Sequence, residues 1–438
     1  MTGFEIGLAM FAAVLVLIAL RMPVGVAMLL VGGLGYAAIT GWTPLLATLR
    51  SMSFSKFSSY TLSVIPLFLL MGDFATKGGL NRALFAAARA WLGHRRGGLG
   101  LATIGGCAAF GAICGSSLAT AATMSQVALP EMRRHGYSPA LATGTLAAGG
   151  TLGILIPPSV ILVIYAIYTE QSIGVMFIAA VIPGILATLC YMAVVNIYAR
   201  VVPGAAPPAE RIPWRARLRP TLEVWPVILV FVLVVTGMYA GWFSATEGAA
   251  VGAAATGVLA VTLGGMRWQG LKESLLSTAE TTGLIFIMLL GAELFSAALA
   301  LSRVPAELSS VIAGLDVPPL AILFAILLIY FILGCFMESM AMVLLTLPIF
   351  IPLMLALDFG LTPQQVLVWF GILVLVSVEV GMISPPFGLN LFVINAMAKD
   401  VPMGQTYRGV MGFVASDVVR IILLVLAPVL SLWLPGLW

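Results

Sequence analysis

The same pair of motifs occurs twice in this chain, each time inside an apolar region. The first copy is A-I-C-G-S-S-L-A-T-A-A-T-M-S-Q-V-A-L-P at 112–130, followed by T-L-G-I-L-I-P-P-S at 151–159. The second copy is F-M-E-S-M-A-M-V-L-L-T-L-P-I-F-I-P at 336–352, followed by V-G-M-I-S-P-P-F-G at 380–388. A polypeptide with two such Gly- and Pro-rich interruptions cannot fold as a bundle of simple continuous helices.

The two copies keep nearly constant offsets. Ser117 and Ser339 are 222 positions apart, and Pro157 and Pro385 are 228 positions apart. Matched offsets with a small drift indicate two halves of shared ancestry that acquired short insertions.

Composition places both halves in a membrane. The 438 residues are 61% hydrophobic and 9% charged, whereas soluble domains carry roughly 25% charged residues. Many apolar runs have the length of about 20 residues that a helix needs to cross a bilayer. The alternation expected of barrel strands is absent. We therefore predict an all-α polytopic membrane protein, and we expect the run from Ile6 to Leu20 to be its first membrane helix rather than a cleaved signal.

The cations predict the orientation of the spans. If the basic clusters between the spans all face the cytoplasm, 17 of the 21 Lys and Arg residues lie inside. Arg50, Lys56 and Arg303 then lie outside, and Arg420 lies within the last span. This asymmetry agrees with the positive-inside rule.

The same orientation predicts a re-entrant hairpin in each half. Arg96 and Arg133 both lie inside, and the 36 residues between them are barely enough for two crossings and a turn. We expect the intervening segment to enter from the cytoplasm and turn back within the membrane. The number of membrane crossings before residue 319 places the start of the segment 319–356 outside. Its flanks around Asp316 and Asp358 carry no cations. The two halves then form an inverted-topology repeat of about ten transmembrane helices plus two re-entrant hairpins.

The repeated motifs have the chemistry of an ion site. A Pro-Pro pair within a span leaves carbonyls of the preceding turn without partners, and such breaks persist at membrane depth only inside protein or beside a wet cavity. The carbonyls at 153–157 and 381–385, with hydroxyls at the hairpin tips, suit Na⁺, while free N–H groups at helix starts suit a carboxylate. The alternative is that small residues merely allow close helix packing. Two matched breaks with two hairpins favour the ion site.

Two acidic residues at membrane depth are functional candidates because an ionised group there is costly. Glu338 lies at the second hairpin tip, where the first half has Ser116, and Glu379 lies just before the second break. Either Glu338 tunes the site or it bonds backbone N–H groups at its own tip. Asp417 and Arg420, three residues apart on a helix, are expected to pair with each other.

The chain lacks the residues of a hydrolytic or redox enzyme. The predicted spans hold no histidine, and the four cysteines show no metal-ligand spacing. A membrane-embedded enzyme or a structural scaffold is the alternative class, and the enzyme would need a catalytic set at membrane depth. We predict that the chain is not an enzyme.

Several motifs together resemble the large membrane subunit, the DctM/SiaM-like M subunit, of tripartite ATP-independent periplasmic (TRAP) transporters within the ion transporter superfamily. They are C-G-S-S-L-A-T-A-A-T, P-E-M-R-R-H-G-Y-S-P, T-L-G-I-L-I-P-P-S, M-G-D-F-A and M-I-S-P-P-F-G-L-N, and the likeness extends over essentially the whole chain. The resemblance implies Na⁺-coupled uptake of an organic acid, such as a C4-dicarboxylate, sialic acid or a keto acid, across the bacterial inner membrane. It also implies a small four-helix (DctQ-like) membrane subunit and a periplasmic (DctP-like) substrate-binding protein. A self-sufficient Na⁺/carboxylate symporter of the same superfamily is the alternative.

The resemblance further implies which residues form the sites. The Na⁺ ligands are expected at Ser116, Ser117, Gly153, Ile156, Pro157, Glu338, Ser339, Gly381 and Ser384. The substrate is expected near Ser116, Ser117, Thr120, Ser339, Pro158 and Pro386.

Finally, the resemblance implies an elevator, in which a transport domain slides against a scaffold domain. The expected parts are a scaffold segment 1–96 that ends in an amphipathic arm helix, a transport segment 97–198 with hairpin 97–130 and broken helix 140–168, a cytoplasmic linker 199–222, a second scaffold segment 223–318, and a second transport segment 319–438 with hairpin 319–356 and broken helix 364–397.

Overall fold

The computed structural model describes residues 2–313 and 317–437, and every regular element within these ranges is a helix. The first half comprises α1 (Gly3–Ala19), α2 (Val24–Thr40), α3 (Trp42–Phe57), η1 (Tyr60–Ser63), α4 (Val64–Lys77), α5 (Leu80–Leu92), α6 (Gly98–Cys114), α7 (Ser117–Arg134), α8 (Pro139–Leu155), α9 (Val160–Tyr168) and α10 (Ile173–Val201). The second half comprises α11 (Trp214–Leu222), α12 (Trp225–Tyr239), α13 (Ala245–Thr262), α14 (Trp268–Ser302), α15 (Val304–Ala313), α16 (Pro319–Gly334), α17 (Ser339–Ala356), α18 (Pro363–Met382), α19 (Leu389–Met397), α20 (Met403–Leu426), α21 (Val429–Leu432) and η2 (Pro435–Leu437).

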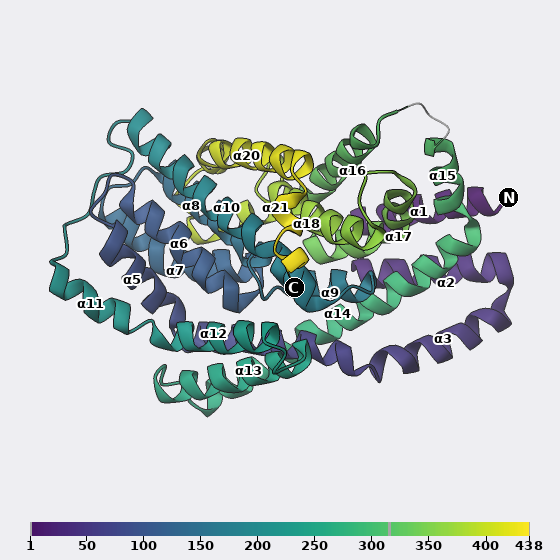
Figure 1. Cartoon of the computed structure of the whole chain (residues 1–438), viewed down its shortest axis with the longest axis horizontal. Helices are drawn as coiled ribbons and strands as arrows, with labels where there is room; N and C mark the ends of the chain where they lie inside the picture. The colour runs from purple at the N-terminus through teal and green to yellow at the C-terminus, as the bar shows by residue number, and fades with distance from the viewer. Residues whose placement is uncertain (1, 314–316, 438) are drawn as a thin grey trace.

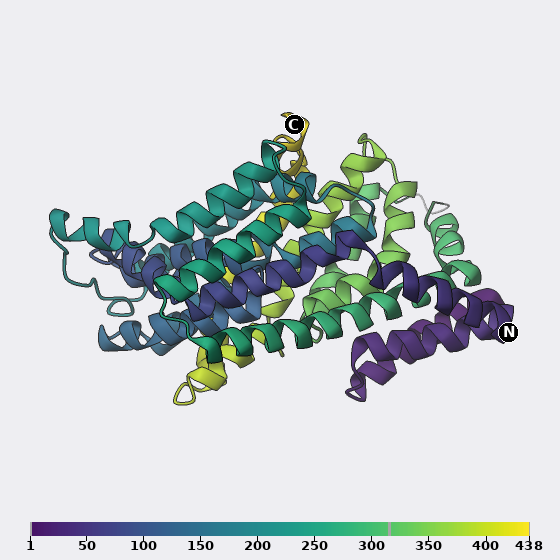
Figure 2. The ribbon, with the colours of Figure 1, turned by 90° about the horizontal axis from the view of Figure 1, so that it is seen from below.

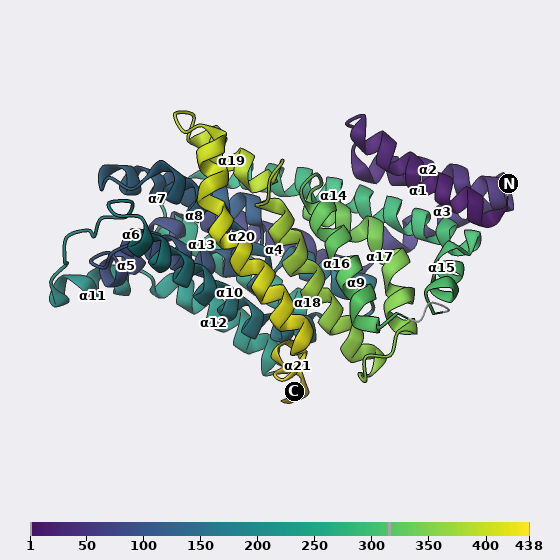
Figure 3. The ribbon, with the colours of Figure 1, turned by 90° about the horizontal axis from the view of Figure 1, so that it is seen from above.

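The helices form an elongated body. Helices α5 and α11 lie at one end of the long axis and α1 and α15 at the other, while the C-terminus lies near the middle (Figure 1). Helices α3 and α4 run alongside α14 down this axis (Figure 2). Seen from the opposite side, α20 crosses the body diagonally and packs on α8, α10 and α18 (Figure 3).

Apolar helices of membrane-spanning length confirm the membrane fold. Among the described residues six helices are long and apolar enough to cross a bilayer, or up to nine if each bent pair is one span. The longest, α14, has 35 residues and extends about 52 Å at 1.5 Å per residue, which is well beyond the roughly 30 Å of a hydrocarbon core.

The helices that precede the two breaks, α8 and α18, are the most deeply buried elements. Every residue of α8 from Leu141 to Leu155 is buried, and so is every residue of α18 from Val366 to Met382. Helices farther from this centre, such as α12 and α14, expose many large apolar side chains. Such faces are stable against lipid rather than water, so the motif-bearing helices form the core and the remaining helices contact the bilayer or further protein.

Helix pairs occupy the segments predicted as hairpins and broken helices, but three helices, α3, α11 and α15, are absent from that prediction. The segment 97–130 is the α6–α7 pair, 319–356 is the α16–α17 pair, and the α8–α9 pair bends by 41°. Helices α3 and α15 occupy segments expected only as connections, and Asp316 lies outside the described residues. Helix α3 contains Arg50 and Lys56 together with several Ser and Thr residues, so it lacks the apolar signal of a span.

The expected linker 199–222 is also partly helical. Helix α11 packs on the amphipathic helix α5, and the Trp91 and Trp214 rings meet edge to face at 5.1 Å. The Arg217 guanidinium lies 5.8 Å from the centroid of each ring, and its Nε donates to the Ile212 carbonyl at 2.9 Å. These aromatic and cation–π contacts hold the Pro-rich segment against the first half.

Candidate functional site

The first hairpin tip packs directly on the first helix break. Gly115 ends α6 with φ +64°, a conformation that glycine adopts without strain. Ser116 caps α7, with its hydroxyl accepting from the Ala119 N–H at 3.4 Å. A Cβ atom on Gly153 would lie 2.5 Å from the Thr120 hydroxyl oxygen and 2.7 Å from the Ser116 carbonyl oxygen. The absent side chain therefore allows backbone-to-backbone contact between tip and break.

The second tip and break are joined in a comparable way. A Cβ atom on Gly381 would lie 2.6 Å from the Gly334 Cα, so α16 and α18 touch through two glycines. The Gly388 N–H donates to the Cys335 carbonyl at 3.2 Å, which ties the chain beyond the break to the hairpin tip.

The Glu338 carboxylate caps its own helix. One of its oxygens accepts from the N–H groups of Met340 and Ala341 at 3.1 and 3.2 Å. Of the two interpretations left open by the sequence, backbone bonding at the tip is the one that the structure contains. An acidic cap at a helix N-terminus also interacts favourably with the helix dipole.

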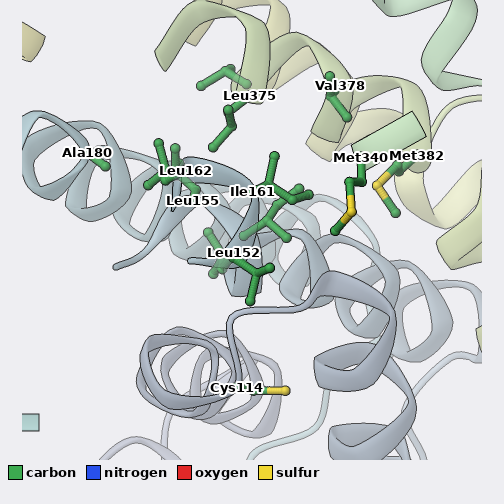
Figure 4. Close-up of a cluster of buried hydrophobic side chains, with 14 of the residues drawn as sticks. Cys114, Leu152, Leu155, Ile161, Leu162, Ala180, Met340, Leu375, Val378 and Met382 are labelled. Atoms are coloured by element: carbon green, nitrogen blue, oxygen red, sulfur yellow. The ribbon is translucent and has the colours of Figure 1, made fainter. Parts of the chain in front are cut away.

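The two hairpin tips meet at Met382. The hydroxyl of Ser117 donates to the Met382 sulfur at 3.6 Å, and the hydroxyl of Ser339 donates to the same sulfur at 2.8 Å. Figure 4 shows Met382 beside Met340 of the second tip and near Ile161 of the first half. The serines predicted from the two repeats are thus brought to one place, although they come from different hairpins.

The remaining predicted residues of the breaks have different surroundings. Both Pro-Pro bonds are cis. Pro158 is buried, whereas Pro386 is exposed and its carbonyl accepts from the Tyr407 hydroxyl at 2.6 Å. The Ser384 hydroxyl donates to the Val380 carbonyl at 2.6 Å and so bonds within its own helix end.

Ile156 and Pro157, the last predicted residues of the first break, face α10. A Cβ atom on Gly184 of α10 would lie 3.1 Å from the Ile156 side chain, and both residues line an apolar groove. Their side chains therefore point away from the meeting point of the serines, and only their backbone carbonyls remain candidates for ion binding.

In each half, the helix that follows the break packs against the other half and forms a hydrogen bond with it. The Asn390 amide of α19 donates to the Ala147 carbonyl of α8 at 3.2 Å. In the other direction, the Tyr165 hydroxyl of α9 donates to the Leu367 carbonyl of α18 at 2.6 Å. These hydrogen bonds are buried and fix the relative position of the two breaks.

The expected Asp417–Arg420 pair is present and belongs to a larger buried network. The Arg420 guanidinium lies 2.9 Å from Asp417 and 3.4 Å from Glu379. The Tyr191 hydroxyl donates to Asp417 at 2.7 Å and lies 3.1 Å from the Thr151 hydroxyl. Thr151 and Glu379 each precede a break by the same number of residues, so this network connects both broken helices through α10 and α20.

Sequence reasoning missed three residues of this centre: Met382, Tyr191 and Asn390. Met382 and Tyr191 lie in apolar runs and carry no sequence signal. Asn390 is the exception, because a fully buried amide four residues after a Pro-Pro pair is a polar group that needs partners. Its Oδ1 and the Thr120 hydroxyl are buried, and neither has a hydrogen-bond partner among the described residues. The centre therefore offers hydroxyl and amide oxygens, backbone carbonyls and two helix N-termini, which together can bind a small cation and a carboxylate.

Comparison with known proteins gives concordant matches over nearly the whole chain. The family described as "Tripartite ATP-independent periplasmic transporter, DctM component" matches residues 11–430. The C4-dicarboxylate TRAP transporter large permease protein DctM of Pseudomonas aeruginosa is 38% identical over 394 residues, covering 89% of this chain and 90% of that protein. The sialic acid TRAP transporter large permease protein SiaM of Vibrio cholerae is 30% identical and covers 95% of each. The crystal structure of the Alcanivorax borkumensis YdaH transporter has a similar fold, with a TM-score of 0.59 at 14% identity over 89% of this chain and 88% of that one.

Proposed function

We propose a function from one premise: the chain belongs to the DctM family of tripartite ATP-independent periplasmic transporters. It is therefore a large permease subunit, a multi-pass protein of the inner membrane, and not an enzyme. What it carries, which ion drives it and how it moves are the subjects of the proposal.

The proposed substrate is a small organic acid. The relatives named for C4-dicarboxylates and for sialic acid both act on carboxylates. The N-terminus of α7 begins at Ser117 and that of α17 at Ser339, and both serines contact Met382. Two helix N-termini near one point direct the positive ends of their dipoles there, which favours a carboxylate.

The proposed coupling ion is Na⁺, and it binds where the tips contact the breaks. The proposed ligands are the carbonyls at 153–157 and 381–385 and the hydroxyls of Ser117 and Ser339. Thr120 supplies a further buried hydroxyl, which has no hydrogen-bond partner within the described ranges. Oxygen ligands of this kind suit a hard cation, and a cation beside a carboxylate offsets part of its charge. The contact of both tip serines with Met382 is the observation that carries this proposal.

The proposed movement is that of an elevator built on an inverted repeat. Element order supports the repeat, since a hairpin, a broken helix and a long helix follow one another in α6–α10 and again in α16–α20. Helices of the first half pack on helices of the second half: α2 packs on α14, and α4 packs on α13. The buried hairpins and breaks would move as one transport domain against these outer helices, while a small membrane subunit and a periplasmic binding protein act as partners.

Uptake into proteoliposomes tests the proposal. The chain, its small subunit and its binding protein are reconstituted, and uptake of labelled dicarboxylates and sialic acid is measured with external Na⁺ or K⁺. We expect uptake only with Na⁺ and only with the binding protein. Equal uptake with K⁺ contradicts the ion assignment, and uptake by the permease alone supports the self-sufficient symporter instead.

A further inference from the structure

We infer that a groove along α10 binds one anionic phospholipid, with an acyl chain against α6 and α12 and the phosphate at Arg95, Arg96 and Arg200. The groove consists of two adjoining pockets of opposite character. Neither pocket includes the Ser117–Met382–Ser339 centre.

The first pocket is apolar. It has a volume of about 640 Å³ and lies between α6, α10 and α12, where Figure 1 shows α12 running below α6 and α7. Ala108 and Ala109 of α6 form one wall, Ile228 and Phe231 of α12 form another, and Thr188 is a rare polar residue in its lining. Such a surface suits a hydrocarbon chain rather than water or a charged solute.

The second pocket is basic and continues the first. It has a volume of about 650 Å³ and shares Leu189 and Met192 of α10 with the apolar pocket. Arg95, Arg96 and Arg200 line it, and its lining contains no acidic residue. These arginines are exposed, and none of them forms an ion pair within residues 2–313 and 317–437.

The surrounding charge reinforces this basic end. His94 lies in the loop between α5 and α6, and its pKa is lowered by burial and by the positive charges of Arg217, Arg211 and Arg95. The neighbouring arginines contribute part of this lowering after burial, and the same positive charges attract an anion.

The two pockets together have the dimensions of a lipid. Their α10 residues run along one helix face from Val181 to Arg200, which corresponds to about 28 Å at 1.5 Å per residue. A single leaflet contributes about half of the roughly 30 Å hydrocarbon core, so a phosphate at Arg200 places its acyl chains beside Leu189 and Ile185. Basic pockets next to apolar grooves between membrane helices are typical binding sites for anionic lipids.

The groove also reaches the first helix break, because Ile156 and Pro157 line its apolar end. An acyl chain there packs against the break, between residues of α12 and α10. We infer that the lipid alters transport as well, and this step alone rests on the proposed function.

Native mass spectrometry of the purified chain tests binding independently of transport. The chain is incubated with palmitoyl-oleoyl phosphatidylglycerol or with phosphatidylcholine of the same chains. We expect one phosphatidylglycerol to bind in preference to phosphatidylcholine. The triple variant R95Q/R96Q/R200Q is expected to weaken phosphatidylglycerol binding roughly 100-fold, at a factor of about five for each arginine near an anionic headgroup.

Matched controls separate this site from general charge effects. The triple variant R134Q/R267Q/R408Q removes the same charge at exposed arginines outside both pockets, and it is expected to bind as the unmodified chain does. Ala109→Phe fills the apolar pocket and is expected to abolish lipid binding, with an unchanged unfolding temperature showing that it folds. Equal binding of both lipids, or equal loss in the two triple variants, overturns the proposal.

Two further outcomes identify other occupants. Glycerol 3-phosphate and inorganic phosphate are titrated against bound lipid, and we expect neither to displace it at millimolar concentration. Displacement would make this a site for a soluble phosphate, and exclusion of lipid by the bound small subunit would make it a protein interface. Either result overturns the lipid assignment.

Discussion

Ser117 of the first hairpin and Ser339 of the second share one partner, the sulfur of Met382, at 3.6 and 2.8 Å. The two serines occupy matching positions in the two copies of the motif. Removing either hydroxyl should therefore affect the same ion-binding event. We expect Ser117→Ala and Ser339→Ala each to raise the Na⁺ concentration for half-maximal uptake by about tenfold, which corresponds to the loss of one oxygen ligand worth about 1.4 kcal/mol.

The control for the serine variants is Ser55→Ala. Its hydroxyl donates to the Met52 carbonyl at 3.2 Å within α3, far from both tips in sequence. Proteoliposome uptake against Na⁺ concentration gives the comparison, and an unshifted Na⁺ dependence in both tip variants would contradict the site.

Gly153→Ala and Gly381→Ala should disrupt the contacts between tips and breaks. The added methyl would lie 2.5 Å from the Thr120 hydroxyl in the first case and 2.6 Å from the Gly334 Cα in the second. Overpacking of this kind costs about 1–3 kcal/mol, so both variants should unfold at lower temperature and lose uptake. Gly404→Ala is the control, since a Cβ atom there would meet nothing within 4 Å. Equal unfolding temperatures of the three variants in detergent would contradict the close contacts at Gly153 and Gly381.

The buried ion network should respond unequally to loss of its charges. Within residues 2–313 and 317–437, Arg420 is the one cation paired with Asp417 and Glu379. Arg420→Gln leaves two buried carboxylates uncompensated and should destabilise the protein by about 3–5 kcal/mol. Glu379→Gln leaves the 2.9 Å Asp417–Arg420 pair balanced, so it should cost much less. Expression level and unfolding temperature show which of the two variants is less stable. A Glu379→Gln variant as unstable as Arg420→Gln would show that the charges do not behave as one network.

Asn390→Ala and Asn81→Ala separate stability from transport. Both amides are buried and donate across helices to a backbone carbonyl, Asn390 to Ala147 and Asn81 to Thr123. Each substitution should destabilise by about 0.5–1.5 kcal/mol, because one buried side-chain hydrogen bond is lost while the helix carbonyl keeps its intrahelical donor. Only Asn390 follows a helix break, so only its variant should lower uptake per folded molecule. Similar uptake by both, normalised to folded protein, would remove Asn390 from the site.

The sequence was sufficient to predict where these helices end and break because glycine and proline act locally. Two prolines end a helix whatever surrounds them, as at Pro157 and Pro385, and the offsets between the copies are visible without a structure. The pairing of Asp417 with Arg420 was predictable for the same reason, since three residues of helix bring the side chains together.

The rest depended on packing between distant segments. Met382 is an ordinary apolar residue until two hairpins place serine hydroxyls on its sulfur. The membership of Tyr191 in the ion network arises from α10 lying against α8 and α20, which no local pattern encodes. Helix α3 was missed because its mixed composition matches neither a span nor a polar loop.

The exchange of segments between the halves affects how this protein is made. Helix α9 packs on α17 and α18. The Tyr165 hydroxyl of α9 donates to the carbonyl of Leu367, which lies 202 positions later in the chain. At 5–20 residues per second, the ribosome needs roughly 10–40 s to deliver that carbonyl. During this interval α9 lacks this contact, so we expect the unfinished N-terminal half to be more accessible to membrane proteases than the completed permease.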